Sequence, residues 1–238
     1  MAALLQVGNV SKHFGGFTAL SKVSLEIAQG ERFGLIGPNG SGKTTLINCI
    51  AGALRNESGK IVFNGKEITG LPAYRRTRLG IARSFQIPRP FHTMSVLENL
   101  LVPSAYVGRL RDVEGEARAM EILSGMGLAD KAHAAASQLS QVELRKLELA
   151  RAMAARPRLL ISDEAMAGLS GAEVAEVLEI LFALNARGIT IIMIEHIMHA
   201  VMRFSQRVVC LDAGRIICEG TPASIVQNAD VQRAYLGA

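Results

Sequence analysis

The chain has 238 residues, of which 26 are basic and 21 acidic, so its formal net charge is +5. Hydrophobic residues make up 49% and charged residues 20%, a composition that is typical of a globular chain and excludes a mainly disordered one. Aromatic residues are only 5% and tryptophan is absent, so stacking platforms for nucleic-acid bases are not expected.

The first third of the chain predicts short strands around one helix. The expected elements are strands over residues 4–10, 23–27, 31–36 and 61–63 and a helix over about residues 43–53. The first two strands would form an antiparallel edge region. Asn64-Gly65 after the last strand predicts a tight turn.

The middle of the chain, from about residue 88 to 139, has a helical pattern and no strand pattern. It opens with Pro88 and Pro90 and carries helix-like runs at 96–101 and 114–126. A strongly amphipathic helix is then expected over residues 141–155, which Pro157 ends. We interpret this region as a helical insertion.

Strands and helices alternate from residue 159 onward. The expected elements are strands over 159–162, 190–194 and 207–212 and helices over 172–186 and 196–204, followed by a hairpin and two short helices. Continuous apolar strands that alternate with helices predict a mostly parallel sheet covered on both faces.

The cysteines and the most apolar stretch bear on where the protein works. Cys49, Cys210 and Cys218 have no metal-type spacing, which favours free thiols in a reducing compartment.

The N-terminus lacks the basic region of a secretory signal. Residues 189–202 are interrupted by charged and histidine side chains, so no membrane span is predicted. If the protein works at a membrane, another chain must supply the span.

Residues 37–44 match the GxxxxGK[ST] pattern of a phosphate-binding loop, between an expected strand and an expected helix. Glycines let the backbone N–H groups turn toward phosphate, and the helix N-terminus adds a partial positive charge. Lys43 would reach the outer phosphates, and the Thr44 hydroxyl would coordinate Mg²⁺. The expected nucleotide-binding residues are Gly37, Pro38, Asn39, Gly40, Ser41, Gly42, Lys43, Thr44 and Thr45. The alternative, a chance glycine-rich turn, fits the flanking elements poorly.

A second motif is the apolar run 159–162 followed by Asp163 and Glu164. A strand that ends in Asp places a carboxylate at the carboxyl edge of the sheet, beside the phosphates. Asp163 would hold Mg²⁺ through water, and Glu164 would orient or deprotonate the attacking water. The alternative is an acidic pair that only caps the next turn.

These two motifs and the residues between them resemble the ATP-binding cassette of ABC transporters over essentially the whole chain. The resemblance implies ATP and Mg²⁺ as ligands and an α/β fold of the P-loop NTPase type. That fold has a mostly parallel core sheet, an antiparallel β edge region and a helical insertion. It places the nucleotide-binding core in residues 1–87 and 157–238 and the insertion, with the signature helix, in residues 88–156.

The resemblance also implies roles for three single residues. Phe14 lies where the family stacks an aromatic ring on adenine; its alternative role is core packing. Gln86 lies at the loop that touches Mg²⁺ and senses the membrane partner; the alternative is a solvated side chain. His196 lies where the switch histidine contacts the γ-phosphate; the alternative is a histidine satisfied at a helix start.

The family signature Leu-Ser-Gly-Gly-Gln is altered in residues 139–143, where the chain reads Leu-Ser-Gln-Val-Glu. Ser140 remains, and it would contact the γ-phosphate of the nucleotide that a partner chain binds. Val142 stiffens the backbone there, and Glu143 either brings a negative charge toward the phosphate or folds back in a capping box with Ser140. The family proline after Glu164 is also replaced, by Ala165. These departures are expected to affect turnover more than nucleotide binding.

Residues 79–86, 93–99, 194–196 and 234–237 resemble the branched-chain amino-acid uptake subfamily, which includes urea, amide and aromatic-acid importers. This implies an ATP-hydrolysing importer subunit at the cytoplasmic face of the inner membrane. Its partners would be integral permease subunits, a second cassette ATPase in a homodimer or heterodimer, and indirectly an extracytoplasmic solute-binding protein, with no nucleic acid.

Three alternatives remain open at this stage. A degenerate cassette would bind nucleotide mainly as a regulatory partner. A soluble cassette ATPase of DNA repair or translation usually carries long coiled-coil inserts or two cassettes in one chain, and this chain has neither. A small-molecule P-loop kinase would leave Gln86, His196 and the helix between them unexplained.

Overall fold

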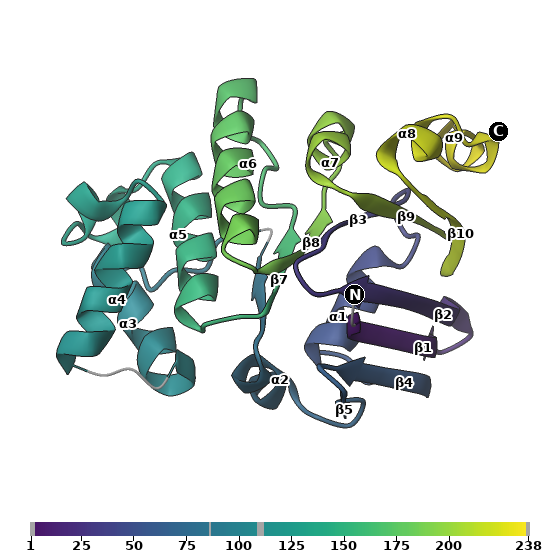
Figure 1. Cartoon of the computed structure of the whole chain (residues 1–238), viewed down its shortest axis with the longest axis horizontal. Coiled ribbons are helices and arrows are strands. Elements are labelled where there is room, and N and C mark those ends of the chain that lie inside the picture. Colours follow the sequence, from purple (N-terminus) through teal and green to yellow (C-terminus); the bar gives the residue numbers. More distant parts are fainter. Residues whose placement is uncertain (1–2, 86, 109–111, 237–238) are drawn as a thin grey trace.

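The computed structural model describes residues 3–85, 87–108 and 112–236, which form two sheets and the helices around them (Figure 1). The main sheet has six strands in the order β10 (Arg215–Gly220), β9 (Arg207–Asp212), β3 (Arg32–Ile36), β8 (Thr190–Ile194), β7 (Leu159–Asp163) and β6 (Ile81–Ser84). Every neighbouring pair is parallel except β9 and β10, which form an antiparallel hairpin. The mostly parallel core sheet expected from the alternating pattern is therefore confirmed.

The antiparallel edge region is a separate sheet. Its four strands run in the order β2 (Phe17–Ala28), β1 (Ala3–Phe14), β4 (Ser58–Phe63) and β5 (Lys66–Glu67). The turn between the last two strands is the one that the Asn-Gly pair predicts, because Asn64 and Gly65 both have left-handed backbone.

Helices cover both faces of the main sheet. They are α1 (Lys43–Ala51), α2 (Ala73–Leu79), α3 (Val96–Pro103), α4 (Asp112–Gly125), α5 (Gln141–Ala154), α6 (Gly171–Ala186), α7 (Met198–Phe204), α8 (Pro222–Val226) and α9 (Ala229–Leu236). Helices α3, α5 and α6 each start after a serine whose capping box closes on a glutamate three residues later. Figure 1 shows α3, α4 and α5 gathered at one end of the molecule. The helical pattern of the middle region is thus confirmed.

Several elements differ from the sequence expectations, in their boundaries or in not having been predicted. Helix α1 ends at Ala51, two residues early, because Gly52 takes a left-handed C-cap with φ 81°. Helix α7 begins at Met198 rather than residue 196. Helix α2 and strand β6 were not predicted, because both are short and carry arginines at positions where an apolar period would show.

Two hydrophobic clusters lie on opposite faces of the main sheet. Successive residues of β7 alternate between them: Leu159 and Ile161 join the cluster of β1, β2, α1 and β4, and Leu160 joins the cluster of the insertion helices, α6 and α7. The carboxyl ends of β3, β7 and β8 are therefore fixed from both sides, and the candidate site lies at these ends.

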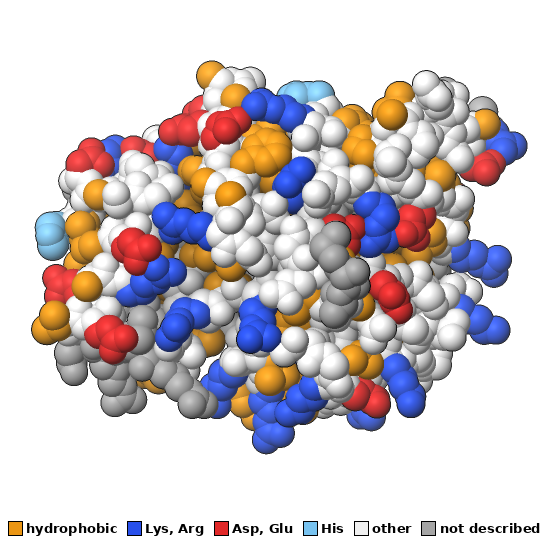
Figure 2. Space-filling view, viewed as in Figure 1, with side chains coloured by type: hydrophobic (Ala, Val, Ile, Leu, Met, Phe, Trp, Pro, Cys, Tyr) orange, Lys and Arg blue, Asp and Glu red, His pale blue; other side chains and the backbone are white. Residues whose placement is uncertain are grey.

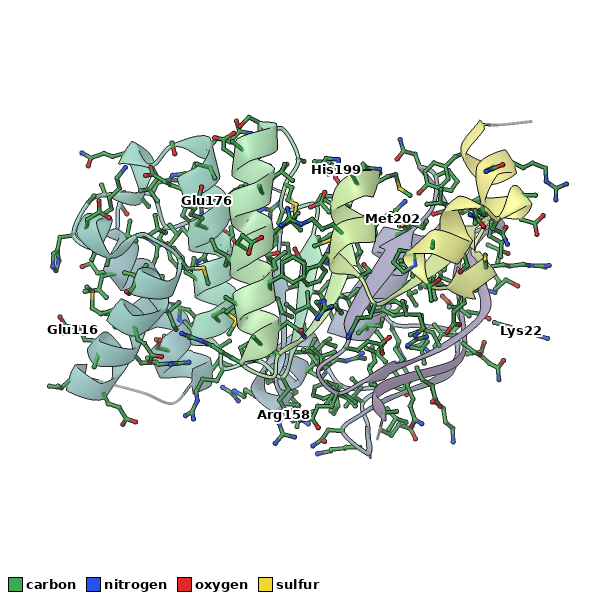
Figure 3. All side chains as sticks on the ribbon, turned by 45° about the horizontal axis from the view of Figure 1, so that its top comes forward. Lys22, Glu116, Arg158, Glu176, His199 and Met202 are labelled. Atoms are coloured by element: carbon green, nitrogen blue, oxygen red, sulfur yellow. The ribbon has the colours of Figure 1, made fainter. Side chains whose placement is uncertain are left out.

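The surface in Figure 2 carries basic and acidic side chains interspersed over one face. Helices α5 and α6 lie side by side, joined by an ion pair of 2.5 Å between Lys146 and Glu176, the latter labelled in Figure 3. Within the described residues no helix is both long and apolar enough to cross a membrane.

Candidate active site

The predicted phosphate loop connects the end of β3 to the start of α1. A Cβ on Gly37 would lie 2.1 Å from the carbonyl oxygen of Leu211, and one on Gly42 would lie 2.6 Å from that of Ala19. Both glycines also have positive φ, 147° and 106°. Only glycine fits either position, so the sequence pattern reflects a backbone that is tightly enclosed.

Lys43 lies folded against its own loop. Its Nζ donates hydrogen bonds to the carbonyl oxygens of Gly37 (2.6 Å) and Pro38 (2.9 Å). The side chain is buried, and this burial lowers the pKa of Lys43 although the nearby Glu164 raises it. The ammonium group is thus held at the mouth of the loop by bonds that a phosphate group can replace.

The rest of the loop divides into exposed and buried parts. Asn39, Gly40 and Thr44 are exposed, and the buried Ser41 is anchored by the N–H of Gly214, which donates to its carbonyl oxygen at 2.9 Å. Asn39 and Gly40 precede α1, and Thr44 lies in its first turn, where the unpaired N–H groups of a helix lie.

Asp163, at the end of β7, is bound by an arginine that the sequence analysis did not single out. Arg83 of β6 donates from Nη2 to Asp163 Oδ2 (2.5 Å) and from Nη1 to Asn48 Oδ1 of α1 (2.6 Å). Strands β6 and β7 are neighbours, which brings these side chains together. Arg83 therefore orients the carboxylate proposed to hold Mg²⁺.

Glu164 and His196 meet across the ends of β7 and β8. His196 Nε2 and Glu164 Oε1 lie 2.9 Å apart, and the N–H of Glu164 donates to the carbonyl oxygen of Ile194 (2.8 Å). Glu164 has a left-handed backbone, with φ 49°. Two residues that lie 32 positions apart in the sequence are thus joined at the site where the resemblance places them.

Glu195 is a buried carboxyl group beside this pair, and the sequence analysis noted it only as an interruption of an apolar run. Its side chain is 2% exposed, and its Oε1 accepts the N–H of Met166 at 2.9 Å. The pKa of Glu195 is raised to about 7, chiefly by burial and also by the nearby charges of Glu164 and Asp163, while the Met166 N–H and Arg145 oppose the rise.

The segment after Glu164 is also held by the signature helix. Arg145 of α5 donates from Nη2 to the carbonyl oxygen of Ala167 (3.1 Å). A Cβ on Gly168 would lie 2.8 Å from Nε2 of Gln141, the first residue of α5. The turn at 166–168 is therefore enclosed by α5 on one side and Glu195 on the other.

The altered signature forms the capping box that was one of its two open interpretations. Ser140 Oγ accepts the N–H of Glu143, and the Glu143 carboxylate accepts the N–H of Ser140 at 2.9 Å. Glu143 also pairs with Lys131 at 2.5 Å, and these bonds lower the pKa of the Glu143 carboxyl. Its charge is folded back and paired rather than directed outward.

Phe14 ends β1 and is 48% exposed, which is inconsistent with the alternative of core packing. The Lys12 ammonium lies 5.2 Å from its ring centroid. Gln86 lies outside the described residues. The structure therefore brings Lys43, Asp163, Glu164 and His196 together at neighbouring strand ends, while Phe14 and Ser140 belong to separate elements.

Thr44 and Asp163 supply oxygen donors, the ligand type that Mg²⁺ prefers. Within the described part of the chain no group of three His, Cys, Asp or Glu side chains could hold a metal ion. This donor set fits Mg²⁺ as it is bound with nucleotides, where one or two protein oxygens act together with phosphate oxygens.

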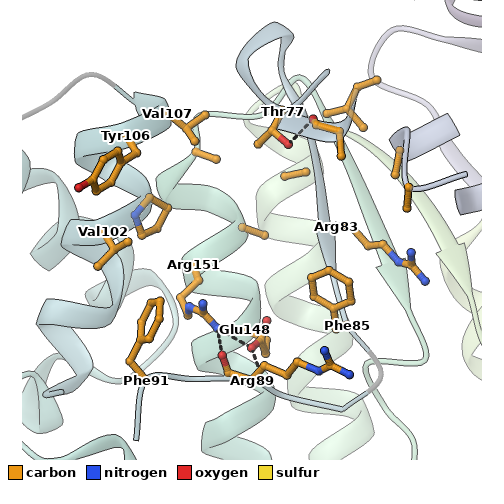
Figure 4. A pocket seen from close by; sticks show the side chains of 18 residues that line it. Thr77, Arg83, Phe85, Arg89, Phe91, Val102, Tyr106, Val107, Glu148 and Arg151 are labelled. Atoms are coloured by element: carbon orange, nitrogen blue, oxygen red, sulfur yellow. Dashed lines mark hydrogen bonds and ion pairs between the residues drawn. The ribbon is translucent and has the colours of Figure 1, made fainter. Parts of the chain in front are cut away.

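A hollow of about 480 Å³ lies between α5, the end of α3, α2 and β6 (Figure 4). Phe85 and Phe91 line it and are 48% and 42% exposed. Glu148 of α5 accepts the N–H of Arg89 (2.7 Å), and Arg151 donates to the Arg89 carbonyl oxygen (2.7 Å). The segment that follows position 86 is therefore tied to the signature helix.

Both the fold and this arrangement of residues define an ATP-binding cassette ATPase. The ABC transporter family model matches residues 20–167, and a model described as branched-chain amino acid ATP-binding cassette transporter matches residues 215–238. The chain belongs to the ABC transporter family.

Its relatives are similar over nearly their whole length. The chain is 40% identical to the high-affinity branched-chain amino acid transport ATP-binding protein LivG of Salmonella typhimurium, over 98% of both chains. It is 38% identical to the probable LivG protein of Archaeoglobus fulgidus, over 99% of this chain and 96% of the other. The ADP conformation of an ABC transporter cassette superposes with a TM-score of 0.92 over 100% of both chains, at 31% identity.

Proposed function

We propose that this chain is the ATPase subunit of an importer for branched-chain amino acids or a related small solute such as urea, an amide or an aromatic acid. One observation carries the assignment of cargo class: the C-terminal residues 215–238 match the branched-chain model, in addition to the cassette match over residues 20–167. The named relatives, which are similar over nearly their full length, support the same assignment.

The site residues would divide the work on ATP. Phe14 stacks on adenine, the loop from Gly37 to Thr45 surrounds the phosphates, and Lys43 exchanges its two carbonyl partners for phosphate oxygens. Glu164 orients or deprotonates the attacking water, and His196 contacts the γ-phosphate while its 2.9 Å contact keeps Glu164 in place.

Thr44, Asp163 and Gln86 would hold Mg²⁺. The bound ion would neutralise the negative charge that develops on the phosphate. Arg83 fixes the orientation of the Asp163 carboxylate through its 2.5 Å bond. Ser140 would act on the nucleotide held by a partner chain, because each signature serves the other site of a cassette dimer in the family that this chain resembles.

The hollow beside Phe85 and Phe91 is the proposed docking place for a permease subunit at the cytoplasmic face of the inner membrane. Its walls combine exposed aromatic rings with Arg83, Arg89 and Arg151. A short apolar helix of the permease would press on segment 87–91, whose backbone is bonded to α5. The extracytoplasmic solute-binding protein would act through the permease.

A degenerate cassette that binds ATP mainly as a regulatory partner is the second candidate. The observation that favours it is the signature without glycines, in which Val142 is packed against the insertion core and Glu143 is bonded to Ser140 and Lys131. Measuring the rate of ATP hydrolysis with and without a partner cassette separates these two candidate functions.

The cargo is tested by uptake of radiolabelled leucine in cells that lack this gene. Wild-type protein should restore uptake and Lys43→Ala should not, because each lost charge-assisted hydrogen bond to phosphate is worth about 1.5–3 kcal/mol. Exposed Lys66→Ala is the matched control. Restoration of urea or amide uptake without leucine uptake would reassign the cargo, and restoration by Lys43→Ala would contradict the energy-coupling role.

The docking place is tested by a cysteine at Arg89. The hydrogen bonds of Arg89 to α5 come from its backbone, so Arg89→Cys retains them. Disulfide or maleimide cross-linking in membranes should join it to a permease subunit. Cross-linking of equal yield from a cysteine at exposed Lys66 would show that the contact is not specific.

A further inference from the structure

The C-terminal helix reaches the phosphate loop through one hydrogen bond. The N–H of Gly37 donates to the hydroxyl oxygen of Tyr235 at 2.8 Å, across 198 positions of sequence. Tyr235 belongs to α9, which contacts β10 at the edge of the main sheet (Figures 1 and 3). Gly37 is buried, so this hydroxyl satisfies a donor that is shielded from solvent.

The N–H and the carbonyl oxygen of Gly37 are each hydrogen-bonded to the side chain of another residue. Tyr235 accepts from its N–H, and Lys43 Nζ donates to its carbonyl oxygen at 2.6 Å. When Lys43 turns to a phosphate, the Tyr235 bond remains to hold the residue at which the loop leaves β3. Burial raises the pKa of Tyr235, so its hydroxyl stays neutral near pH 7 and able to accept.

We propose that Tyr235 is a positioning residue that pre-organises the phosphate loop, so that nucleotide affinity depends on the C-terminal segment. A loop whose first residue is already fixed loses less conformational freedom when ATP binds. The inference rests on ATP binding by this cassette and not on the identity of the transported solute.

Attachment of α9 to the rest of the molecule has a separate basis. Val231 of α9 is buried in the cluster that also contains Ile225 and the core of α7. Tyr235 as a whole is 41% exposed, and its specific contact is the hydrogen bond that its hydroxyl oxygen accepts. Tyr235→Phe therefore removes the hydrogen bond and leaves the helix docked.

The experiment compares Tyr235→Phe with the matched control Tyr74→Phe in the full-length chain. Tyr74 is 56% exposed on α2 and does not line the hollow described above. We expect Tyr235→Phe to weaken ATP affinity in calorimetry about three- to tenfold, the range of one net hydrogen bond. The KM for ATP should rise by the same factor while kcat stays within about twofold, and the Gly37 amide should exchange faster with deuterium.

Two results would overturn the proposal. Unchanged ATP affinity together with a lower melting temperature would mean that the hydroxyl only anchors α9. Unchanged affinity and unchanged amide exchange would mean that the bond does not restrain the loop. Neither result bears on which solute is transported. The inference can therefore fail while the proposed transport function stands.

Discussion

Glu164 and His196 illustrate how single residues at this site control one another. The 2.9 Å contact joins the residue proposed to activate water to the one proposed to contact the γ-phosphate. Glu195, the neighbour of His196, holds the turn after Glu164 through the N–H of Met166. Two consecutive residues after β8 therefore hold the turn that carries the proposed general base.

Glu164→Gln should separate binding from hydrolysis. Its amide oxygen still accepts a hydrogen bond from His196, but the amide cannot take a proton from water. Loss of a general base costs about 10²–10⁴-fold in rate. We expect phosphate release to slow by that factor while ATP affinity in calorimetry stays the same. Turnover within about threefold of wild type would remove Glu164 from the role of base.

Glu195 should make stability depend on pH in a defined direction. Its pKa is raised from 4.5 to about 7 in the folded chain, so its contribution is fully present below about pH 4.5 and is lost as pH rises through about 7. Glu195→Gln retains the acceptor for the Met166 N–H and cannot ionise. The variant should therefore gain stability over wild type across this window, by about 3 kcal/mol.

Guanidinium denaturation of both proteins at a series of pH values measures this difference. The gap should open above about pH 4.5 and level off above about pH 7, the limits set by the two pKa values. Other titrating groups cancel in the comparison of the two proteins. Stability curves that run parallel over the whole range would show that Glu195 does not titrate between those limits.

At the scale of elements, α5 links three parts of the site. Its first residues form the altered signature, Arg145 bonds the turn after Glu164, and Glu148 with Arg151 bonds the segment beside the hollow. A displacement of this helix would reach the catalytic turn and the proposed permease contact together.

Restoring the family signature should raise the ATPase rate of the isolated chain. Gln141→Gly with Val142→Gly frees backbone N–H groups to approach phosphate, at a cost in helix stability of about 1 kcal/mol for each glycine. One recovered charge-assisted bond corresponds to about tenfold in rate. The readout is steady-state phosphate release, with melting temperatures to confirm folding.

Glu143→Gln alone is the matched control for that experiment. Glutamine at this position still closes a capping box, and the Glu143 charge is already paired with Lys131. We expect the single change to have little effect on the rate. If the wild-type chain hydrolyses ATP rapidly and the two glycines do not change that rate, Ser140 and the helix N-terminus already bind the γ-phosphate well enough.

The sequence predicted the local features of these elements better than the distant ones. The Ser140–Glu143 capping box lies within four residues and was one of two interpretations that the spacing allowed, and the alternation after residue 159 predicted the parallel sheet. Partners such as Arg83 for Asp163 and Tyr235 for Gly37 depend on which strands and helices become neighbours. The spacing of apolar residues along the chain does not indicate which strands and helices become neighbours. The proposed domain boundaries and site roles stay predictions.

At the scale of the whole molecule, the cassette carries both the residues proposed to bind nucleotide and an altered signature. In a heterodimer its own phosphate loop would work with a partner's signature, and its altered signature would serve the partner's loop. The two composite sites would then differ in rate although each contains ATP.

Mixing this chain with a partner cassette tests that asymmetry. The mixture should hydrolyse ATP faster than either chain alone, and Glu164→Gln in this chain should remove well over half of the gain, because it inactivates the competent site. The matched control is the corresponding substitution in the partner, which should remove less. Loss of about half from each variant would indicate two equivalent sites.

The left-handed backbone of Glu164, with φ 49°, lowers the stability of the turn that carries it. Such a conformation costs a non-glycine residue about 1–3 kcal/mol, and the strand ends, Glu195 and α5 together hold it in place. Any substitution that relaxed this turn would make the protein harder to unfold and would also let the carboxylate leave His196. The strained turn and the contact between Glu164 and His196 are thus properties of the same peptide.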